Sequence, residues 1–228
     1  MGLINYLAKF FQDGGFWMWP ILVVGGIGLA IALERNIKLT LVKRANKKMW
    51  DSLQPVLAEG DFDKAREMTE NDSSSISRLL SLGLARQGAV RRREDIEIAM
   101  EEGMMEIIPQ LETRTPFLAL FSNIATLLGL LGTVMGLIEA FTAVAHAAPS
   151  EKADLLAAAI SVGMNTTAFG LMWGIPLLML HAFTVARTGS IVDSLEMASV
   201  KTLNIISAAS RRAAEHAANA AVNKDKAA

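Results

Sequence analysis

Three long runs without any acidic or basic residue dominate the pattern of apolar and polar positions along the chain. They cover residues 14–33, 115–138 and 155–186. An α-helix rises 1.5 Å per residue, so about 20 residues cross the ~30 Å hydrocarbon layer of a bilayer. Each run is at least that long, and the second continues past one glutamate to about residue 148. The pattern therefore predicts three transmembrane helices, of which the second and third are long enough to tilt or to project into water.

The polar stretches between these runs are also predicted to be helical, so the expected fold is an all-α membrane protein with three transmembrane helices and long helical extensions. Gly60 interrupts one helical pattern and Asp61 follows it as a candidate N-cap. In order, we expect an N-terminal segment (1–15), the first transmembrane helix (16–34), a helical polar region (35–114), the second transmembrane helix (115–148), a short hairpin (149–154), the third transmembrane helix (155–186) and a C-terminal helix and tail (187–228).

Basic residues predict the orientation of these segments. Of the 22 Lys and Arg residues, all but Lys9 and Lys152 fall within 35–114 or 187–226. Because Lys and Arg concentrate on the cytoplasmic side of membrane proteins, both large polar regions should be cytoplasmic, with the N-terminus and the 149–154 hairpin outside. A cleaved signal peptide is not expected, since a single basic residue precedes the first run and no small-residue cleavage site follows it.

Composition changes this picture only by excluding chemistry. Hydrophobic residues make up 52% of the 228 residues and the mean hydropathy is +0.34, which fits a chain that is partly in a bilayer and partly in water. Cysteine is absent and the three histidines are far apart in sequence. With no recognisable catalytic or nucleotide-binding motif, the sequence predicts no enzymatic activity, no cofactor and no metal site. The Arg91–Arg93 triplet is interpreted as a solvated loop before a helix rather than as a nucleic-acid site.

Small and hydroxyl-bearing residues form one continuous face on each of the last two predicted spans. Steps of three and four residues along the second span meet only small side chains: Ala119, Ser122, Thr126, Gly129, Thr133, Gly136 and Ala140. The corresponding face of the third span holds Gly163, Thr167, Gly170 and Gly174. Thr166 falls outside that face, and we expect it at a helix–helix contact.

Two interpretations of these faces remain open. Small residues let helix backbones approach closely, and Thr hydroxyls can bond across helices or to their own preceding turn, so one interpretation is that the faces serve packing alone. Alternatively they line a polar pathway, with Thr133 and Thr167 facing each other near the middle of the membrane. Titratable groups are nearly absent from the spans, apart from Glu139 near the outer end of the second, His146 near the outer surface and His181 in the inner part of the third. If protons cross here, a partner must supply the acid, and the threonine hydroxyls would solvate it.

Three stretches carry a resemblance to a known family: "GGFWMWPILVVGGIGLAIALERNIKL", "LETRTPFLALFSNIATLLGLLGTVMGLIEAF" and "NTTAFGLMWGIP". They resemble the ExbB/TolQ branch of the MotA/TolQ/ExbB proton-channel family, in three spans that come in the same order. The most specific part is "GLLGTVMG" together with "TAFGL" followed by "IP". The family's pore threonines match Thr133 and Thr167, the two residues that the small faces also select.

The resemblance implies a homopentamer in the bacterial inner membrane, with a central pore lined by the second and third helices. That pore would hold a dimer of ExbD/TolR-like single-span proteins, each supplying an essential Asp. Proton flow through this molecular motor would energise a TonB- or TolA-like protein for outer-membrane transport or envelope maintenance. The residues expected along the proton pathway are Thr133, Thr167, Thr126, Ser122 and Glu139. Small residues facing the pore or packing beside it are Gly129, Gly136, Gly163, Gly170 and Gly174.

One position departs from the family pattern. Many relatives carry a Glu five residues before the pore Thr of the third span, where this chain has Val162. His181, Glu34 and Arg187 are candidates for another proton exit, although each is also suited to a membrane interface. Pro116 and Pro176 are expected at hinges or kinks. The rival function is a non-conducting membrane scaffold whose small faces serve only packing, and in either case membrane lipids surround the spans.

Overall fold

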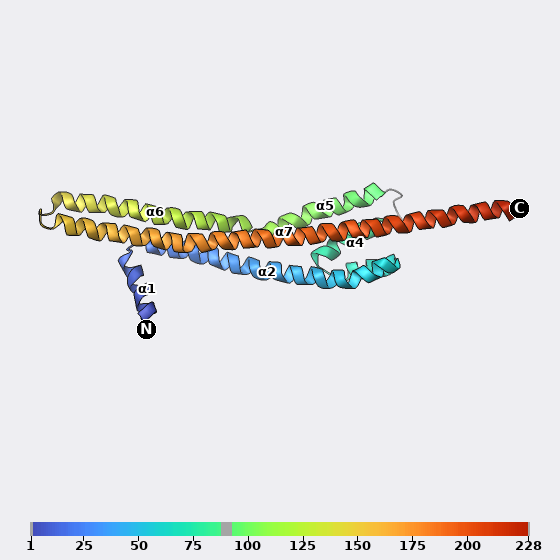
Figure 1. Ribbon diagram of the computed structural model, residues 1–228, viewed down its shortest axis with the longest axis horizontal. Coiled ribbons are helices and arrows are strands. Elements are labelled where there is room, and N and C mark those ends of the chain that lie inside the picture. Colours follow the sequence, from blue (N-terminus) through green and yellow to red (C-terminus); the bar gives the residue numbers. More distant parts are fainter. Residues whose placement is uncertain (1, 88–92, 228) are drawn as a thin grey trace. The chain divides into compact units, whose positions relative to one another are not determined.

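The computed structural model describes the backbone of residues 2–87 and 93–227, and the side chains of these residues except 3–8 and 213–227. The described residues form helices and no strand, as the sequence predicted, with bounds α1 (Gly2–Asp13), α2 (Met18–Glu59), α3 (Phe62–Glu70), α4 (Ser75–Arg86), α5 (Arg93–Glu112), α6 (Thr115–His146) and α7 (Lys152–Ala227) (Figure 1). Arg91 and Arg92 of the basic triplet lie outside the described residues.

Three helical stretches of the described chain are long and apolar enough to cross a membrane, namely Met18–Glu59, Arg93–His146 and Lys152–Arg212. The expected count of three candidate spans is therefore confirmed. The chain divides into two compact units. One contains residues 1–36 and 114–186, and the other contains residues 37–113 and 187–228. Each unit is described separately below.

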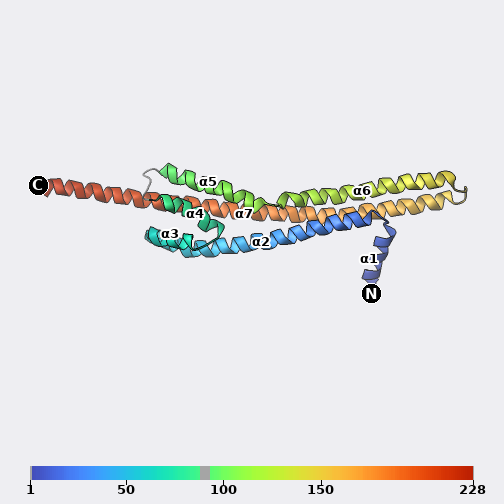
Figure 2. The ribbon, with the colours of Figure 1, turned by 180° about the vertical axis from the view of Figure 1, so that it is seen from behind.

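The first unit is built on an antiparallel pair made of α6 and the first part of α7. The two helices run side by side in both ribbon views, joined by the short turn at residues 147–151 (Figures 1 and 2). The beginning of α2 packs on α7, with Gly25 beneath Trp173 and Gly28 beneath Leu177. Because glycine has no side chain, the indole and the leucine can lie directly on the α2 backbone.

The outward surfaces of this unit are strongly apolar. Many large hydrophobic side chains of α2, α6 and α7 are exposed, including Ile27, Leu127, Phe141, Met172 and Phe183. Contiguous exposed apolar surface of this extent marks a face that meets lipid or another protein chain. The arrangement suits a helix hairpin in a bilayer, since a helix satisfies its backbone amides internally apart from those of its first turn.

The N-terminal segment forms a helix that the sequence pattern did not reveal. Phe10 and Phe11 at the end of α1 pack against Phe169 of α7, with ring centroids 6.3 and 5.7 Å apart. Phe11 also meets Trp19 edge-on at 5.1 Å. The two contacts of Phe11 are edge-to-face, a geometry that stabilises aromatic pairs beyond simple burial of their surface. The aromatic cluster therefore fastens α1 to the same helix that carries Thr167.

A sharp break separates α5 from α6. Arg114 has a left-handed backbone (φ 64°), and Pro116 is the second residue of α6. Proline favours this first helical turn because its missing N–H has no partner there in any case. Pro116 therefore marks the beginning of α6, whereas Pro176 lies inside the continuous helix α7. Arg114 also forms an ion pair of 2.7 Å with Glu34.

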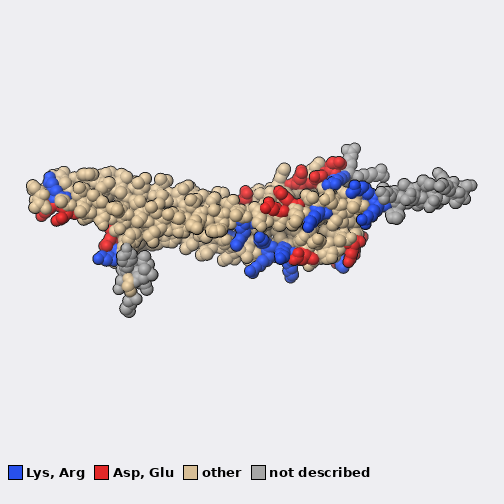
Figure 3. All heavy atoms as spheres, viewed as in Figure 1, with Lys and Arg blue, Asp and Glu red and all other residues tan. Residues whose placement is uncertain are grey.

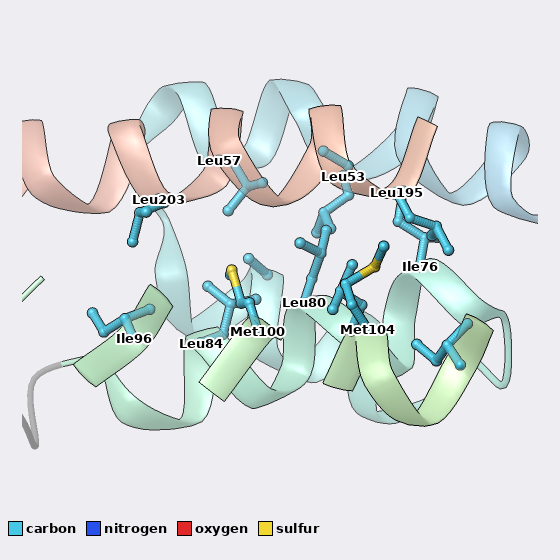
Figure 4. Close-up of a cluster of buried hydrophobic side chains, with 14 of the residues drawn as sticks. Leu53, Leu57, Ile76, Leu80, Leu84, Ile96, Met100, Met104, Leu195 and Leu203 are labelled. Carbon is cyan, nitrogen blue, oxygen red and sulfur yellow. The ribbon is translucent and has the colours of Figure 1, made fainter. Parts of the chain in front are cut away.

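The second unit is a bundle of α3, α4, α5 and the adjoining parts of α2 and α7 around a leucine- and methionine-rich core (Figure 4). Leu53 and Leu57 of α2 face Leu80 and Leu84 of α4, while α5 contributes Met100 and α7 contributes leucines from the opposite side. The helical spacing read along 96–111 is confirmed, since the core members on α5 are Ile96, Met100, Met104, Ile107 and Leu111.

Short polar side chains fix the starts of the small helices in this unit. As expected, Asp61 caps α3, its carboxylate accepting the N–H of Lys64 at 3.1 Å. Ser74 caps α4, and Asp72 accepts hydrogen bonds from the hydroxyls of both Ser74 and Ser77. Burial raises the pKa of the Asp72 carboxyl, but these hydrogen bonds and the charge of Lys48 lower it more, so the pKa lies below its ordinary value.

Candidate functional site

The small faces predicted on the second and third spans pack against each other within one chain. Gly129 of α6 lies opposite Gly170 of α7, so closely that a Cβ on Gly170 would be 2.9 Å from the Cα of Gly129 and 2.7 Å from the carbonyl oxygen of Ala125. Such an approach is possible only without side chains between the backbones. Gly163 likewise lies against Thr133, with 3.1 Å between its would-be Cβ and the Thr133 Cα.

Thr133 and Thr167 meet at this close approach. Their hydroxyls are in direct hydrogen-bond contact, and the Thr133 hydroxyl also lies 2.9 Å from the carbonyl oxygen of Gly163. The Thr167 hydroxyl lies 3.0 Å from the carbonyl oxygen of Gly129. A hydroxyl has one proton to donate and two lone pairs that accept hydrogen bonds. Each oxygen therefore retains acceptor capacity after it donates its proton to a backbone carbonyl.

The threonine pair is only half-buried in the chain. Part of each side chain therefore reaches the surface of the first unit, between the apolar side chains described above. A polar group at such a surface is costly in lipid unless another group pairs with it. The pair is thus a small polar patch that can accept a hydrogen bond from a donor outside the chain.

Ser122 and Thr126, further along the same face, form hydrogen bonds within the helix pair. The buried Ser122 hydroxyl donates to the carbonyl oxygen of Gly174 at 2.6 Å, which ties α6 to α7. The Thr126 hydroxyl donates to the Ser122 carbonyl of its own helix at 3.1 Å. At the other end of the face the helices are less tightly apposed, since a Cβ on Gly136 would meet only the Ala159 carbonyl oxygen at 3.8 Å.

Thr166 lies at a helix contact, as expected. Its side chain is 1% exposed, and its hydroxyl is 2.9 Å from the carbonyl oxygen of Gly14 and 2.8 Å from that of Val162. Its methyl group faces Gly132 of α6. Sequence spacing separated Thr166 from the small face but could not identify the N-terminal partner, because Gly14 is 152 positions away in the chain.

The remaining candidate residues lie away from the threonine pair. Glu139 is exposed on α6 and forms no ion pair with any described residue. Glu34 pairs with Arg114, and His181 is half-buried on α7. In the second unit, Arg187 donates to the Thr40 hydroxyl at 2.8 Å. Within the described chain, no group of three or more potential metal-binding His, Cys, Asp or Glu side chains comes together.

Comparison with known proteins decides the relationship of this chain. The model of the MotA/TolQ/ExbB proton channel family matches residues 71–197, more than half of the sequence. The chain belongs to this family. It is 30% identical over 174 residues to the biopolymer transport protein exbB1 of Vibrio cholerae, covering 75% of each chain. It is also 34% identical over 93 residues to the Tol-Pal system protein TolQ of Haemophilus influenzae, covering 41% of this chain and 40% of that one.

The relatives place the chain in the ExbB/TolQ branch of the proton channel family. A third relative, an ExbB homologue of Methanothermobacter thermautotrophicus, is 25% identical over 200 residues, or 86% of this chain and 70% of its own. The family match ends at residue 197 and so includes α6, the threonine pair and the apolar part of α7. As a family of membrane channel proteins it supports a role other than catalysis.

Proposed function

We propose that this chain is the channel-forming subunit of a proton-driven motor in the bacterial inner membrane. Several copies, five by resemblance, would surround a central pore, with α6 and the apolar part of α7 lining it. A partner of the ExbD/TolR type would occupy the pore and supply the titratable Asp. The complex would then energise a TonB- or TolA-like protein, for outer-membrane transport or envelope maintenance.

The observation that supports this proposal most directly is the half-buried pair Thr133 and Thr167 in a surface made mostly of apolar side chains. A carboxylic acid crossing a membrane must be solvated both when protonated and when charged. Each hydroxyl can accept a hydrogen bond from the protonated acid, and by turning away from its backbone carbonyl it can donate one to the carboxylate. The spans of this chain hold no acid beside the pair, so the acid would come from the partner.

The orientation in this proposal follows from the basic residues. The second unit, with most of the Lys and Arg residues, would be cytoplasmic, and the 147–151 turn would be periplasmic. The α1 helix would then lie on the periplasmic side, fastened to α7 by its aromatic cluster. Val162, at the position where many relatives have a Glu, is 36% exposed on α7. Proton exit would therefore use groups other than a carboxylate at residue 162.

A non-conducting scaffold is the second candidate, and one specific observation favours it. The small faces of α6 and α7 are used for packing inside a single chain, so their presence alone does not require a pathway. The two functions differ in what the hydroxyls do. In a scaffold, Thr133 and Thr167 hold helices together; in a channel they must also exchange hydrogen bonds with an external acid.

The test replaces Thr133 and Thr167 by Val, singly and together, in the complex purified with its native partner. After reconstitution into liposomes with a pH-sensitive dye inside, we expect each single change to lower proton flux about tenfold, the effect of about 1.4 kcal/mol on a barrier. Thr142→Val is the matched control, because Thr142 lies on α6 and bonds only its own Ile138 carbonyl at 2.9 Å. Full proton flux in the assembled double variant would disprove the channel role of the pair.

A further inference from the structure

A groove of about 510 Å³ lies between α5 and α7 in the second unit. Buried Met100, Met104 and Leu203 contribute apolar surface to it. Three exposed carboxylates, Glu97, Glu101 and Glu196, also line it. An apolar groove bordered by like charges suits an occupant with apolar and basic side chains, because a neutral or acidic one would leave the carboxylates uncompensated.

These three carboxylates differ from their neighbours in lacking an internal partner. On the other side of α5, Glu106 pairs with Arg78 at 2.7 Å and Glu102 lies 3.8 Å from Arg86. By contrast, no basic side chain among the described residues comes within ion-pair distance of a carboxylate in the groove. In the space-filling view, acidic side chains gather over α5 (Figure 3).

A ridge of complementary chemistry runs along α2 in the same unit. It is made of Ile37, Leu41, Arg44 and Lys48, which follow one another at helical spacing and share one face. Ile37 is 62% exposed and Leu41 59% exposed, and both basic side chains are also exposed. Neither basic residue forms an ion pair with a described residue, although the charge of Lys48 contributes to the lowered pKa of Asp72. Basic side chains gather over α2 in the same view (Figure 3).

Two contacts show how the helices of the second unit are aligned along their length. Lys43 of α2 donates to the Ser190 hydroxyl of α7 at 3.0 Å, so these two positions lie at similar levels, within the reach of the lysine side chain. Ser199 of α7 contacts the sulfur of Met100 of α5 at 3.0 Å, which makes those two positions level as well. Counting along each helix from these contacts gives the level of any other residue.

On this alignment the basic residues of the ridge and the acidic residues of the groove lie at similar levels. Lys48 is level with residue 195 of α7, which is one residue, or about 1.5 Å along the axis, from Glu196. The level of Glu101 is three residues, or about 4.5 Å, from that of Lys48. Arg44 is about 7.5 Å above Glu196 on the same count, a separation that its long side chain can bridge. All copies of a membrane protein share one orientation and depth, so neighbouring copies can only join residues at similar levels.

We infer that the α5–α7 groove of one copy receives the Ile37–Lys48 ridge of α2 from a neighbouring copy. The inference rests on the proposed assembly from several copies and adds the surfaces that join them. Because the groove and the ridge are different surfaces, each copy uses one for each neighbour, which is the head-to-tail arrangement that closes into a ring. Leu41 and Ile37 cover apolar surface, while Arg44 and Lys48 neutralise the groove carboxylates.

Anionic lipid is a less suitable partner for this ridge. The charge-free part of α2 has already ended at Ile37. Lys48 lies 11 residues further along, or about 16 Å along the helix. Electrostatic attraction to a membrane surface falls off within about 8 Å at physiological salt. The far end of the ridge therefore matches a protein surface better than a layer of headgroups.

Cross-linking between differently tagged copies tests the contact directly, because the chain has no natural cysteine. One copy carries Lys48→Cys and the other Glu101→Cys, and both are co-expressed in membranes and treated with a short bis-maleimide. We expect a product that contains both tags. The control pairs Lys64→Cys, an exposed residue of α3 outside the ridge, with Glu101→Cys, and should give no such product. Absence of the Lys48–Glu101 product in an assembled oligomer overturns the inference.

Charge reversal provides an independent measurement. In full chains without introduced cysteines, Arg44→Glu with Lys48→Glu should lower the assembled fraction at least tenfold. Adding Glu101→Lys with Glu196→Lys should restore it. Lys64→Glu, the control for net charge, should leave assembly unchanged. Reversal without effect on assembly overturns the inference, as does cross-linking of Glu101→Cys to a different protein only. Proton flux of the Thr133 and Thr167 variants is measured separately, so either proposal can fail alone.

Discussion

The hydroxyl of Thr166 lies 2.9 Å from the carbonyl oxygen of Gly14, a contact between the third apolar helix and the short connection between α1 and α2. Thr166→Val keeps the shape of the side chain but leaves that carbonyl without its partner. We expect a loss of about 1 kcal/mol, seen as a melting midpoint in detergent that is about 2–4 °C lower. Thr166→Ser, which retains the hydroxyl, should lose less than half as much. No loss for Val, with a loss for Ser, would show that packing of the methyl group, and not the hydrogen bond, stabilises the site.

The backbone contact between α6 and α7 predicts a large difference between two glycine substitutions. Gly170→Ala places a methyl group against the Ala125 carbonyl and Gly129, which are backbone atoms and cannot move aside cheaply. We expect a destabilisation of about 1–3 kcal/mol, typical of overpacking. Gly26→Ala, which would meet open space, should be neutral or stabilise its helix by up to about 1 kcal/mol. The two purified variants are compared by thermal unfolding in the same detergent, and similar midpoints would contradict the close approach.

The left-handed backbone of Arg114 predicts an order among its replacements. Arg114→Ala and Arg114→Gly both remove the ion pair with Glu34, so their difference isolates the backbone term. A side chain with a Cβ pays about 1–2 kcal/mol in this conformation, whereas glycine does not. We therefore expect the Gly variant to be more stable than the Ala variant by about 1 kcal/mol in chemical unfolding. The reverse order would mean that the chain between α5 and α6 has another conformation.

The lowered pKa of Asp72 predicts a pH dependence of stability in the second unit. Its folded-state pKa lies below the ordinary value of 3.8, so the folded chain binds this proton less readily than the unfolded chain. The carboxylate therefore stabilises the fold fully above about pH 4, and this contribution is lost as the pH falls through the lowered pKa.

Comparison of Asp72→Ala with the parent chain between pH 2.5 and 7 measures this contribution. The difference in unfolding midpoint should be constant near neutral pH and should shrink in the acidic range. The exposed Asp51→Ala is a control that should show little pH-dependent difference. If the Asp72→Ala difference stayed constant down to pH 2.5, the hydrogen bonds from Ser74 and Ser77 would not be responsible.

Much of the fold can be predicted from the sequence, because the apolar runs are long and the helical periodicity is regular. The turn between α6 and α7, the Asp61 cap, the apolar face of α5 and the continuation of α7 past Ser190 all follow from local patterns. The helix α1 and the left-handed Arg114 did not follow. The aromatic contacts of α1 with Phe169 are remote in sequence, and no glycine marks the left-handed position.

The candidate site was only partly accessible to sequence reasoning. Spacing placed Thr133 and Thr167 on facing small surfaces, and the structure brings their hydroxyls together. Spacing could not show that the Ser122 hydroxyl donates to the Gly174 carbonyl, or that Gly25 of α2 packs beneath Trp173. These details depend on which helix faces which, and that choice is made by tertiary packing rather than by any single helix.

The contact between Gly129 and Gly170 has a mechanical consequence. Two backbones that touch without side chains between them cannot move closer together. We therefore expect α6 and this part of α7 to tilt and shift as one rigid body. A force on the threonine pair would then displace both helices together, and a small local displacement would be transmitted along the whole helix pair.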